Sequence, residues 1–549
     1  MLYAFNAAPS AQPPKTPLVW SLNLAQQVNS AYTAVNCSAL TFDFGPCDSG
    51  DGIASAPPGG GVVGPYVGVT GTPVIDTSGG ANNNTLYVVA AVAVPSGNQT
   101  QVFYYLFAVD ITKGQVRGTP TQILGSVTGN APPIQGGLCT SDYPTPGTVL
   151  FDSNHIQRSG LLLMPNGQVY VAFAPAGHEI ENGWMFAYSF NSNSGIFTQT
   201  AKFNSTPWGT GGGIWGSGAG PASDGTDIYT ATGNGTLFDT VTQNIPYDIG
   251  DALLKLNSGL TVIDFYAPPD AGRERCINDL DFGSGGVLVV PSPFTYNTTS
   301  VLINADKESN LYVTNQATGS MGKFNGSSNC TNTFNNIQCI TTPAIPSNDP
   351  TQGYWGSPAY WSYTPDGVNY TYMLYYSADA PKTVGTNGGP GTAKVAPMPV
   401  NGYELATMGP GGPIPSTFSS TSTLFCGYSP TPSVSSNAMM PQTGIVWAIE
   451  SNQNSHNTGQ QSSPDCAGTQ PTGEPAALHA FCATAGAPGG PCPTALTELY
   501  SSRNVTTQIN HSNAFTIPTI SNGQVYMGTE REVDVFGLCS TSPLGQCLN

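Results

Sequence analysis

The stretch Leu106-Phe107-Ala108-Val109-Asp110, followed by Ile111-Thr112-Lys113-Gly114, decides the fold because its pattern returns along the whole chain. An apolar segment with an aromatic residue and an alanine runs into Asp or Asn, and a Gly turn often follows. Short apolar segments of this kind are typical of β-strands, and Gly turns with Asp or Asn join adjacent antiparallel strands. The sequence therefore predicts that each copy is a strand that ends in a tight turn.

Eight copies of this phrase divide the chain into eight similar units. They begin at Leu2, Leu106, Met185, Leu253, Leu311, Gly402, Leu478 and Val533. A second phrase with a proline precedes many copies, as at 71–74 and 356–359, and a third lies between them, as at 167–171 and 523–527. Each unit is therefore expected to contain three or four short strands.

Short antiparallel sheets repeated this often have two faces to bury. A closed β-propeller does this while protecting the strand edges, whereas a solenoid fits units with so many hairpins poorly. We predict an all-β protein, a single eight-bladed β-propeller of four-stranded antiparallel blades, with residues 1–549 as one domain. The chain ends should meet in one blade, with residues 533–538 pairing near residues 1–6.

The composition supports a large folded protein and excludes some partners. Hydrophobic residues make up 39% of the 549 residues, and charged residues only 8%, against roughly 25% in an average soluble protein. The net charge of -18 argues against nucleic acid or an anionic membrane surface as partner, because such binding depends on clustered Lys and Arg. No apolar run approaches the roughly 20 residues that a membrane helix needs, so no membrane span is expected.

Cysteines and glycosylation sequons indicate an oxidising compartment. Four neighbouring pairs among the twelve cysteines are expected to form local disulfides: Cys37–Cys47, Cys330–Cys339, Cys482–Cys492 and Cys539–Cys547. The sequons include those at Asn83, Asn98, Asn204, Asn234, Asn325 and Asn504. We therefore predict a secreted protein, extracellular or periplasmic. No signal peptide opens the chain, and residues 1–6 already resemble the interior of a strand, so we expect that the chain lacks its natural start or begins after processing.

The strand phrase ending in Asp/Asn-x-x-Thr-Gly resembles the repeat of quinoprotein alcohol dehydrogenases. These are eight-bladed propellers that bind pyrroloquinoline quinone (PQQ) and calcium, and the resemblance is closest to their PQQ-binding-like relatives. It covers nearly the whole chain at the level of the repeat. Because proteins without quinone share this repeat, it specifies the fold better than the activity.

The resemblance also assigns the cofactor contacts. Trp215, which follows Gly211-Gly212-Gly213, is similar to the tryptophan on which the quinone ring stacks. Lys307 occupies the place of the basic residue that contacts the quinone. A flat cofactor needs an aromatic face, and a lysine would stabilise charge on its oxygens.

The same resemblance implies a calcium site and a catalytic base. Asn234, in Thr232-Gly233-Asn234, is similar to a calcium ligand, and Glu179 is expected to be a second ligand. Asp279 resembles the catalytic aspartate, which would also contact the metal, and Asp281 is the alternative carboxylate. Calcium binds several oxygens and would polarise a quinone carbonyl, while the aspartate takes the proton of an alcohol or sugar substrate.

Two departures from the family keep a second function open. No two cysteines are adjacent, and no arginine precedes Arg117, so two of the family's contacts with the quinone have no counterpart. Asn234 also lies in a sequon, and a glycan there would exclude the metal role. The alternative to a PQQ- and calcium-dependent dehydrogenase is a non-catalytic extracellular propeller, which binds proteins or glycans at its rims or has a structural role.

Overall fold

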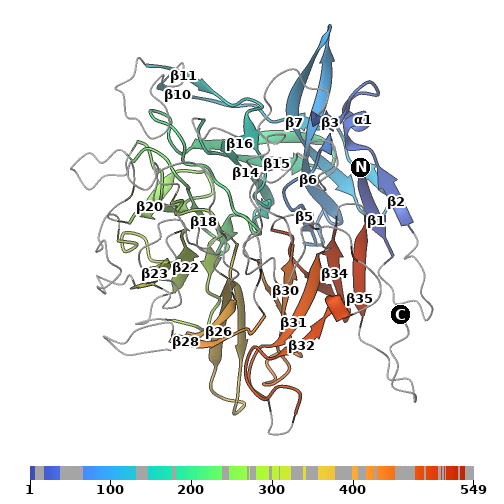
Figure 1. The fold of residues 1–549 in the computed structure, drawn as a ribbon. Coiled ribbons are helices and arrows are strands. Elements are labelled where there is room, and N and C mark those ends of the chain that lie inside the picture. Colours follow the sequence, from blue (N-terminus) through green and yellow to red (C-terminus); the bar gives the residue numbers. More distant parts are fainter. Residues whose placement is uncertain are drawn as a thin grey trace, which may run out of the picture.

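The computed structural model describes most of the strand-forming part of the chain (Figure 1). The described residues are 1–6, 18–37, 66–130, 146–175, 181–237, 247–268, 271, 280–295, 300–307, 310–322, 338–341, 356–377, 399–405, 416–423, 425, 430–451, 476–486, 490–504, 509, 512, 515–529 and 532–537. Among them, short antiparallel strands dominate, and the fold is all-β. One short helix, α1 (Leu24–Val28), lies near the start.

The amino-terminal half contains three larger sheets and two ribbons. The ribbons are β1 (Leu2–Phe5) with β2 (Leu18–Leu22), and β10 (Ser126–Asn130) with β11 (Pro146–Leu150). The first large sheet contains β3 (Thr33–Asn36), β4 (Tyr66–Val67), β5 (Val74–Asp76), β6 (Thr85–Ser96), β7 (Gln99–Asp110), β8 (Gln115–Val116) and β9 (Thr121–Gln122). The second contains β12 (His155–Ile156), β13 (Leu162–Leu163), β14 (Gln168–Pro175), β15 (Trp184–Asn191) and β16 (Ile196–Asn204), and the third β17 (Ala222–Ser223), β18 (Ile228–Ala231), β19 (Leu253–Leu256) and β20 (Val262–Tyr266).

The carboxy-terminal half continues with sheets of four strands, each paired in chain order. They are β21 (Leu288–Val289), β22 (Val301–Ala305), β23 (Asn310–Asn315) and β24 (Gln338–Thr341); β25 (Ala359–Tyr363), β26 (Thr371–Ser377), β27 (Val400–Glu404) and β28 (Ser416–Ser420); and β29 (Ser433–Ser435), β30 (Ile445–Glu450), β31 (Ala477–Cys482) and β32 (Glu498–Ser501). The last sheet has three strands, β33 (Thr519–Ser521), β34 (Gln524–Gly528) and β35 (Val533–Gly537). A single-turn 3-10 helix, Ser502–Asn504, follows β32.

The repeated phrases occupy equivalent strands, which confirms the strand prediction. The eight copies of the first phrase lie in β1, β7, β15, β19, β23, β27, β31 and β35. From β15 to β31 each copy forms the third strand of its four-strand path, with the other strands paired around it in chain order. The proline phrases stand at the first strands, as at β25, and the third phrases form second strands, β14 and β34. The units from β17 to β35 are therefore antiparallel meanders.

Apolar side chains join each sheet to the next one in the chain. Leu254 of β19 packs in one cluster with Ala172 of β14, and Leu302 of β22 packs in another with Tyr229 of β18. Similar clusters link the sheets on to β33–β35. The middle strands are buried on both faces, as in β18 and β19, because strand side chains alternate between two faces and each face here meets a neighbouring sheet.

The turns that precede the first strands of the sheets are also joined in chain order. The hydrogen bonds run from Leu161 N–H to Thr72 O, Gly160 N–H to Ala219 O, Ser217 N–H to Ser284 O, Gly286 N–H to Ser357 Oγ, Ser357 N–H to Thr431 Oγ1, and Ser433 Oγ to Pro518 O. Ser357 Oγ also donates to Ser217 O at 2.9 Å. First strands joined one after another in this way are typical of a propeller-like arrangement.

The eight-blade count and the pairing of the chain ends are not found in the described residues. These residues form seven sheets of three or more strands and the two ribbons. The first copy of the phrase, in β1, pairs with β2, while the eighth copy, in β35, pairs with β34. Leu2 of β1, with Trp20 and Leu22 of β2, packs against apolar residues of β6 and β7, so β1 has an apolar partner away from the last sheet.

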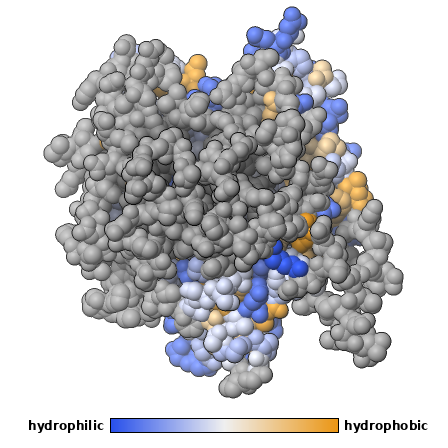
Figure 2. Space-filling model, in the orientation of Figure 1, coloured by the Kyte–Doolittle hydropathy of each residue, from blue (hydrophilic) through white to orange (hydrophobic). Residues whose placement is uncertain are grey.

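The ribbon β1–β2 leaves its other face uncovered among the described residues. Tyr3 and Phe5 stack on each other with ring centroids 6.2 Å apart, and both side chains are exposed, as is Val19. The apolar colour on the right of Figure 2 lies where Figure 1 places this ribbon. No helix in the described part of the chain is long and apolar enough to cross a membrane.

One predicted disulfide is confirmed. Cys482, at the end of β31, bonds Cys492 across ten residues, with their Cα atoms 5.8 Å apart. Cys37 is disulfide-bonded as well, but its predicted partner Cys47 lies outside the described ranges, so this pairing stays a prediction. Cys330, Cys539 and Cys547 also lie outside those ranges, so the remaining two pairings stay predictions.

Candidate functional site

Several residues that the sequence analysis assigned to one site do lie together. Asn234 follows β18 and Lys307 follows β22, and both contact Asp281. Trp215 lies against Gly233, the residue before Asn234. Glu179 and Asp279 fall outside the described residues, so their roles as metal ligand and base stay predictions. The carboxylate found in the cluster is Asp281, the alternative that the sequence favoured less.

Asp281 is the centre of this cluster. Its side chain is buried, and its Oδ2 lies 2.6 Å from the Lys307 Nζ, whose side chain is also buried. Its Oδ1 accepts the Asn234 N–H at 2.6 Å, and its main-chain oxygen accepts the Lys307 N–H at 3.1 Å. Charge-assisted hydrogen bonds of this kind are the strong ones. Asp281 therefore ties the turn after β18 to the turn after β22.

Gly233 explains why these groups approach so closely. A Cβ atom at this position would lie 2.1 Å from Asp281 Oδ1 and 2.7 Å from Trp215 Nε1. Real side chains do not tolerate such distances, so glycine is required for close packing here. The Thr-Gly-Asn sequence thus brings the Asp281 carboxylate and the Trp215 indole to the same point.

The Trp215 ring has a partner that the sequence analysis did not identify. The Arg158 guanidinium carbon lies 4.6 Å from the Trp215 ring centroid and 4.9 Å from that of Phe515. Stacking of a guanidinium on aromatic rings is favourable, most of all for tryptophan. Only 6% of Trp215 is exposed. Arg158 is far from Trp215 and Phe515 in sequence and carries no motif, so no sequence signal pointed to this contact.

A second buried carboxyl, that of Asp248, contacts Thr236, two residues after Asn234. The sequence analysis did not identify it either. Asp248 Oδ1 accepts the Trp208 N–H at 2.8 Å, and its Oδ2 accepts the Thr236 hydroxyl at 3.2 Å. Burial raises the pKa of Asp248 to about 7, although these two hydrogen bonds act to lower it. Thr236 is the threonine of the Asn234 sequon, and both residues are buried, so a glycan on Asn234 does not fit this fold.

In the described conformation Trp215 and Lys307 are engaged by other side chains; Glu179 and Asp279 lie outside the described residues, so the calcium and quinone sites stay predictions. Arg158 covers one face of the Trp215 ring, and Lys307 is bound to Asp281. Both contacts would have to break before Trp215 and Lys307 met a quinone. The described residues contain no group of three or more His, Cys, Asp or Glu side chains placed to hold a metal ion. The arrangement instead serves to join sheets through buried polar groups.

Another charged network lies in the sheet β29–β32. His479 Nδ1 is 2.7 Å from Glu498 and its Nε2 is 3.3 Å from Glu450, which also binds Arg503 at 2.7 Å. Burial lowers the pKa of His479, but the hydrogen bonds to Glu450 and Glu498 outweigh it and raise that pKa above its usual value. The sequence analysis assigned no histidine to a site. This network joins three strands.

Comparisons with known proteins add no family. No family model matches the chain, and no curated protein matches it. Among solved structures, Saccharomyces cerevisiae Sqt1 has 10% identity and a TM-score of 0.34, with 86% of this chain and 96% of that chain covered. The β-propeller domain of the Trilobed protease from Pyrococcus furiosus has 8% identity and a TM-score of 0.19, with 70% and 89% covered. PorZ from Porphyromonas gingivalis has 11% identity and a TM-score of 0.22, with 87% of this chain and 64% of that chain covered. Likenesses this low carry no argument, so the fold rests on the sheet topology.

Proposed function

We propose that this chain is a non-catalytic propeller protein that works outside the cytoplasm by binding ligands at its loops and sheet edges. The observation that carries this proposal is that the groups expected to hold a cofactor bind one another. Asp281 holds Lys307 and the turn at Asn234, and Arg158 lies on Trp215. A site whose charged groups are already paired has little left with which to recognise a second charged molecule.

The competing proposal is the PQQ- and calcium-dependent dehydrogenase of alcohols or sugars. The convergence of Trp215, Asn234, Asp281 and Lys307 supports it as a statement of ancestry. In that case Trp215 and Lys307 would contact the quinone, Glu179, Asn234 and Asp279 would hold calcium, and Asp279 would act as the base. Bound calcium would polarise the quinone as a Lewis acid.

One experiment separates the two proposals. Purified protein is dialysed against PQQ with calcium chloride, and bound quinone is measured by absorbance, with dye reduction by ethanol and glucose as the second readout. We expect no saturable quinone binding and no dye reduction. Stoichiometric binding that Lys307→Met abolishes would overturn the proposal. Arg158→Ala, which uncovers Trp215, is the matched variant: if the Arg158 contact blocks a latent site, only this variant binds quinone.

The closed eight-bladed ring and the secreted location belong to the same proposal. The contacts between successive first strands support a ring, and an experimental structure with all eight copies in separate blades would establish the count. The Cys482–Cys492 bond supports an oxidising compartment, because disulfides persist there. Non-reducing mass mapping of protein from its natural source should find most of the twelve cysteines paired; free thiols at most positions would contradict the location.

A further inference from the structure

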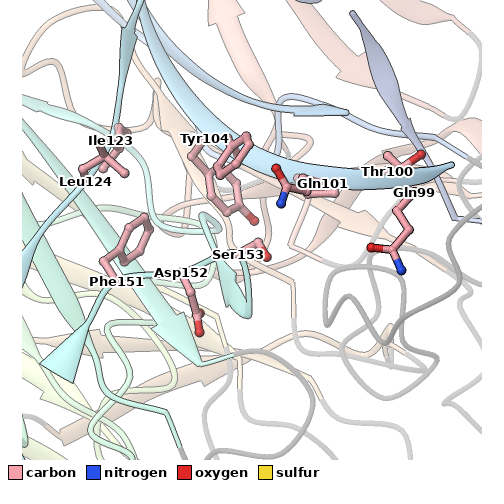
Figure 3. Close-up of a pocket in the computed structure, with 11 residues that line it drawn as sticks. Gln99, Thr100, Gln101, Tyr104, Ile123, Leu124, Phe151, Asp152 and Ser153 are labelled. Atoms are coloured by element: carbon pink, nitrogen blue, oxygen red, sulfur yellow. The ribbon is translucent and has the colours of Figure 1, made fainter. Parts of the chain in front are cut away.

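An open cavity lined by both polar and apolar side chains lies beside the long hairpin β6–β7, and none of its lining residues belongs to the Asp281 cluster. Its volume is about 490 Å³, and its lining comes from residues 99–104 of β7, from Ile123 and Leu124, and from residues 151–153. Figure 3 shows Gln99, Thr100 and Gln101 along one side, and Phe151, Asp152 and Ser153 along another. Cavities of roughly 300–1,000 Å³ are the usual size for small-molecule sites.

One wall of the cavity is a strand edge that has no strand partner among the described residues. Strand β7 pairs with β6 along its whole length, but on its other edge β9 reaches only Tyr105 and Leu106. The Tyr104 carbonyl on that edge accepts the Ile123 N–H at 2.8 Å. Because backbone groups alternate between the two edges of a strand, those of Thr100 and Val102 point to the same side as those of Tyr104. They are therefore directed at the cavity.

The lining side chains offer hydrogen bonds without positive charge. Gln99 and Gln101 supply amides, Thr100 and Ser153 supply hydroxyls, and the lining includes no Lys or Arg. Tyr104 and Phe151 also line the cavity, with ring centroids 6.4 Å apart, but both side chains are buried, so they supply only small apolar edges to it. An amide offers donors and an acceptor within one planar group, so it can bind two neighbouring hydroxyls at once.

Asp152 is the single charged group of this lining, and it is held in place. Its Oδ1 accepts the Asn154 N–H at 2.9 Å and lies 3.1 Å from the His155 Nδ1. His155 is itself fixed, because its Nε2 lies 3.0 Å from the Asn182 carbonyl. The Asp152 side chain is 54% exposed, so it can still accept hydrogen bonds from a ligand. A fixed acceptor beside an open cavity favours a ligand that donates hydrogen bonds.

We propose that this cavity binds a neutral saccharide. Its lining matches a ligand with many hydroxyl groups and an apolar ring face, and the carboxylate without a nearby cation disfavours anionic ligands. An extended peptide could also pair with the open edge of β7, but the concave, hydroxyl- and amide-lined space favours a compact ligand. The inference deepens the proposed binding function and rests on it.

Ligand-detected saturation-transfer NMR on the full chain tests this assignment. The probes are glucose, galactose, N-acetylglucosamine and cellobiose, with glucuronate as the anionic counterpart. We expect transfer to at least one neutral sugar and none to glucuronate. Gln101→Ala should weaken that binding about tenfold, since a hydrogen bond contributes roughly one power of ten at most. Gln115→Ala, an exposed glutamine of the same sheet outside the cavity, should leave it unchanged.

Three outcomes would overturn the assignment. They are an absence of transfer to every neutral sugar, equal binding by wild type and Gln101→Ala, and binding of a lysine-containing extended peptide in place of sugars. Each outcome is independent of the quinone experiment. If neither sugar nor quinone binds, the saccharide assignment is wrong, but the proposal of a non-catalytic protein still stands. Quinone binding with dye reduction removes that proposal itself.

Discussion

The cluster around Asp281 and the cavity beside β7 are both polar, but they use their hydrogen-bonding groups differently. In the cluster, the Asp281 carboxylate is bound by Lys307 and by the Asn234 N–H, all within the protein. In the cavity, Gln99 and Gln101 are exposed and Asp152 is half exposed. Buried polar groups must be paired within the fold, whereas groups in an open cavity can be paired by water or by a ligand.

This difference separates two roles that look alike in sequence. A conspicuous set of Trp, Asn, Asp and Lys residues at strand ends predicts a ligand site, yet here these groups bind each other and join sheets. The cavity is lined by ordinary Gln, Thr and Ser residues that no motif marks. Recognition requires polar groups that are fixed and still open to a ligand, and of the two regions only the cavity combines both.

The largest effect is expected at Lys307. Lys307→Met leaves the buried Asp281 carboxylate without its cation, and breaking a buried ion pair costs about 3–5 kcal/mol. Denaturant unfolding of variant and wild type side by side measures this loss. The double variant Lys307→Met/Asp281→Asn removes both charges and should recover much of the stability. If Lys307→Met costs less than about 1 kcal/mol, the cluster is not the structural joint described here.

Asp248 should show a smaller effect that depends on pH. Its folded pKa of about 7 lies above its ordinary value of 3.8, so the stability gained from the protonated group is full below about pH 4 and is lost as the pH rises through 7. Asp248→Asn does not titrate at this position. The free energy of unfolding of the variant relative to that of wild type should therefore rise by a few kcal/mol between pH 4 and pH 7. Above pH 7 this difference should stay constant.

The same unfolding measurements made at pH 4, 5, 6, 7 and 8 follow this gap. Asp366→Asn on an exposed turn is the control, because the Asn369 and Val368 N–H groups lower the pKa of Asp366. Its stability contribution therefore changes only below about pH 4, and its gap to wild type should stay nearly constant from pH 5 to pH 8. A gap between Asp248→Asn and wild type that does not change with pH would show that Asp248 is ionised in the folded protein.

The smallest effect on stability is expected in the cavity. Gln101→Ala removes an exposed amide, and surface substitutions usually change stability by less than about 0.5 kcal/mol. The same variant should weaken sugar binding about tenfold. Loss of binding with unchanged stability is the opposite of the result expected for Lys307→Met. If Gln101→Ala lowers the free energy of unfolding by more than about 1 kcal/mol, Gln101 has a structural role as well, and the two regions do not differ as described.

The sequence predicted the strands well because their signal is local. The copies at Leu106, Met185 and Leu253 carry alternation and turn residues that are sufficient to specify a strand and its hairpin. The gathering of Trp215, Asn234 and Lys307 was also predictable, because the resemblance fixes their order along the chain. Their contacts with each other were not predictable from the sequence, because the position of the Asp281 carboxylate depends on the absence of a side chain at Gly233 and on the packing of two turns.

The remaining features depend on long-range geometry. Arg158 meets Trp215 and Phe515 only because three distant segments come together. The cavity exists because β9 pairs with only two residues of β7, and no sequence pattern specifies where a strand pairing stops. The raised pKa of Asp248 depends on burial by the turns around it. A count of blades likewise needs the pairing of the chain ends, which the repeat alone leaves open.

The burial of Asn234 has a consequence for how this protein is made. Glycosyltransferases of a secretory pathway act on the nascent chain, where the Asn234-Gly235-Thr236 sequon is as accessible as that of Asn98 at the tip of the β6–β7 hairpin. Once the chain has folded, Asn98 is still exposed while Asn234 is enclosed. If the chain is made in a secretory pathway, folding and modification therefore compete at Asn234. A glycan attached to its side chain before folding would have to be accommodated where Asn234 is buried and its carbonyl accepts the Gly212 N–H, and a host without N-glycosylation avoids this.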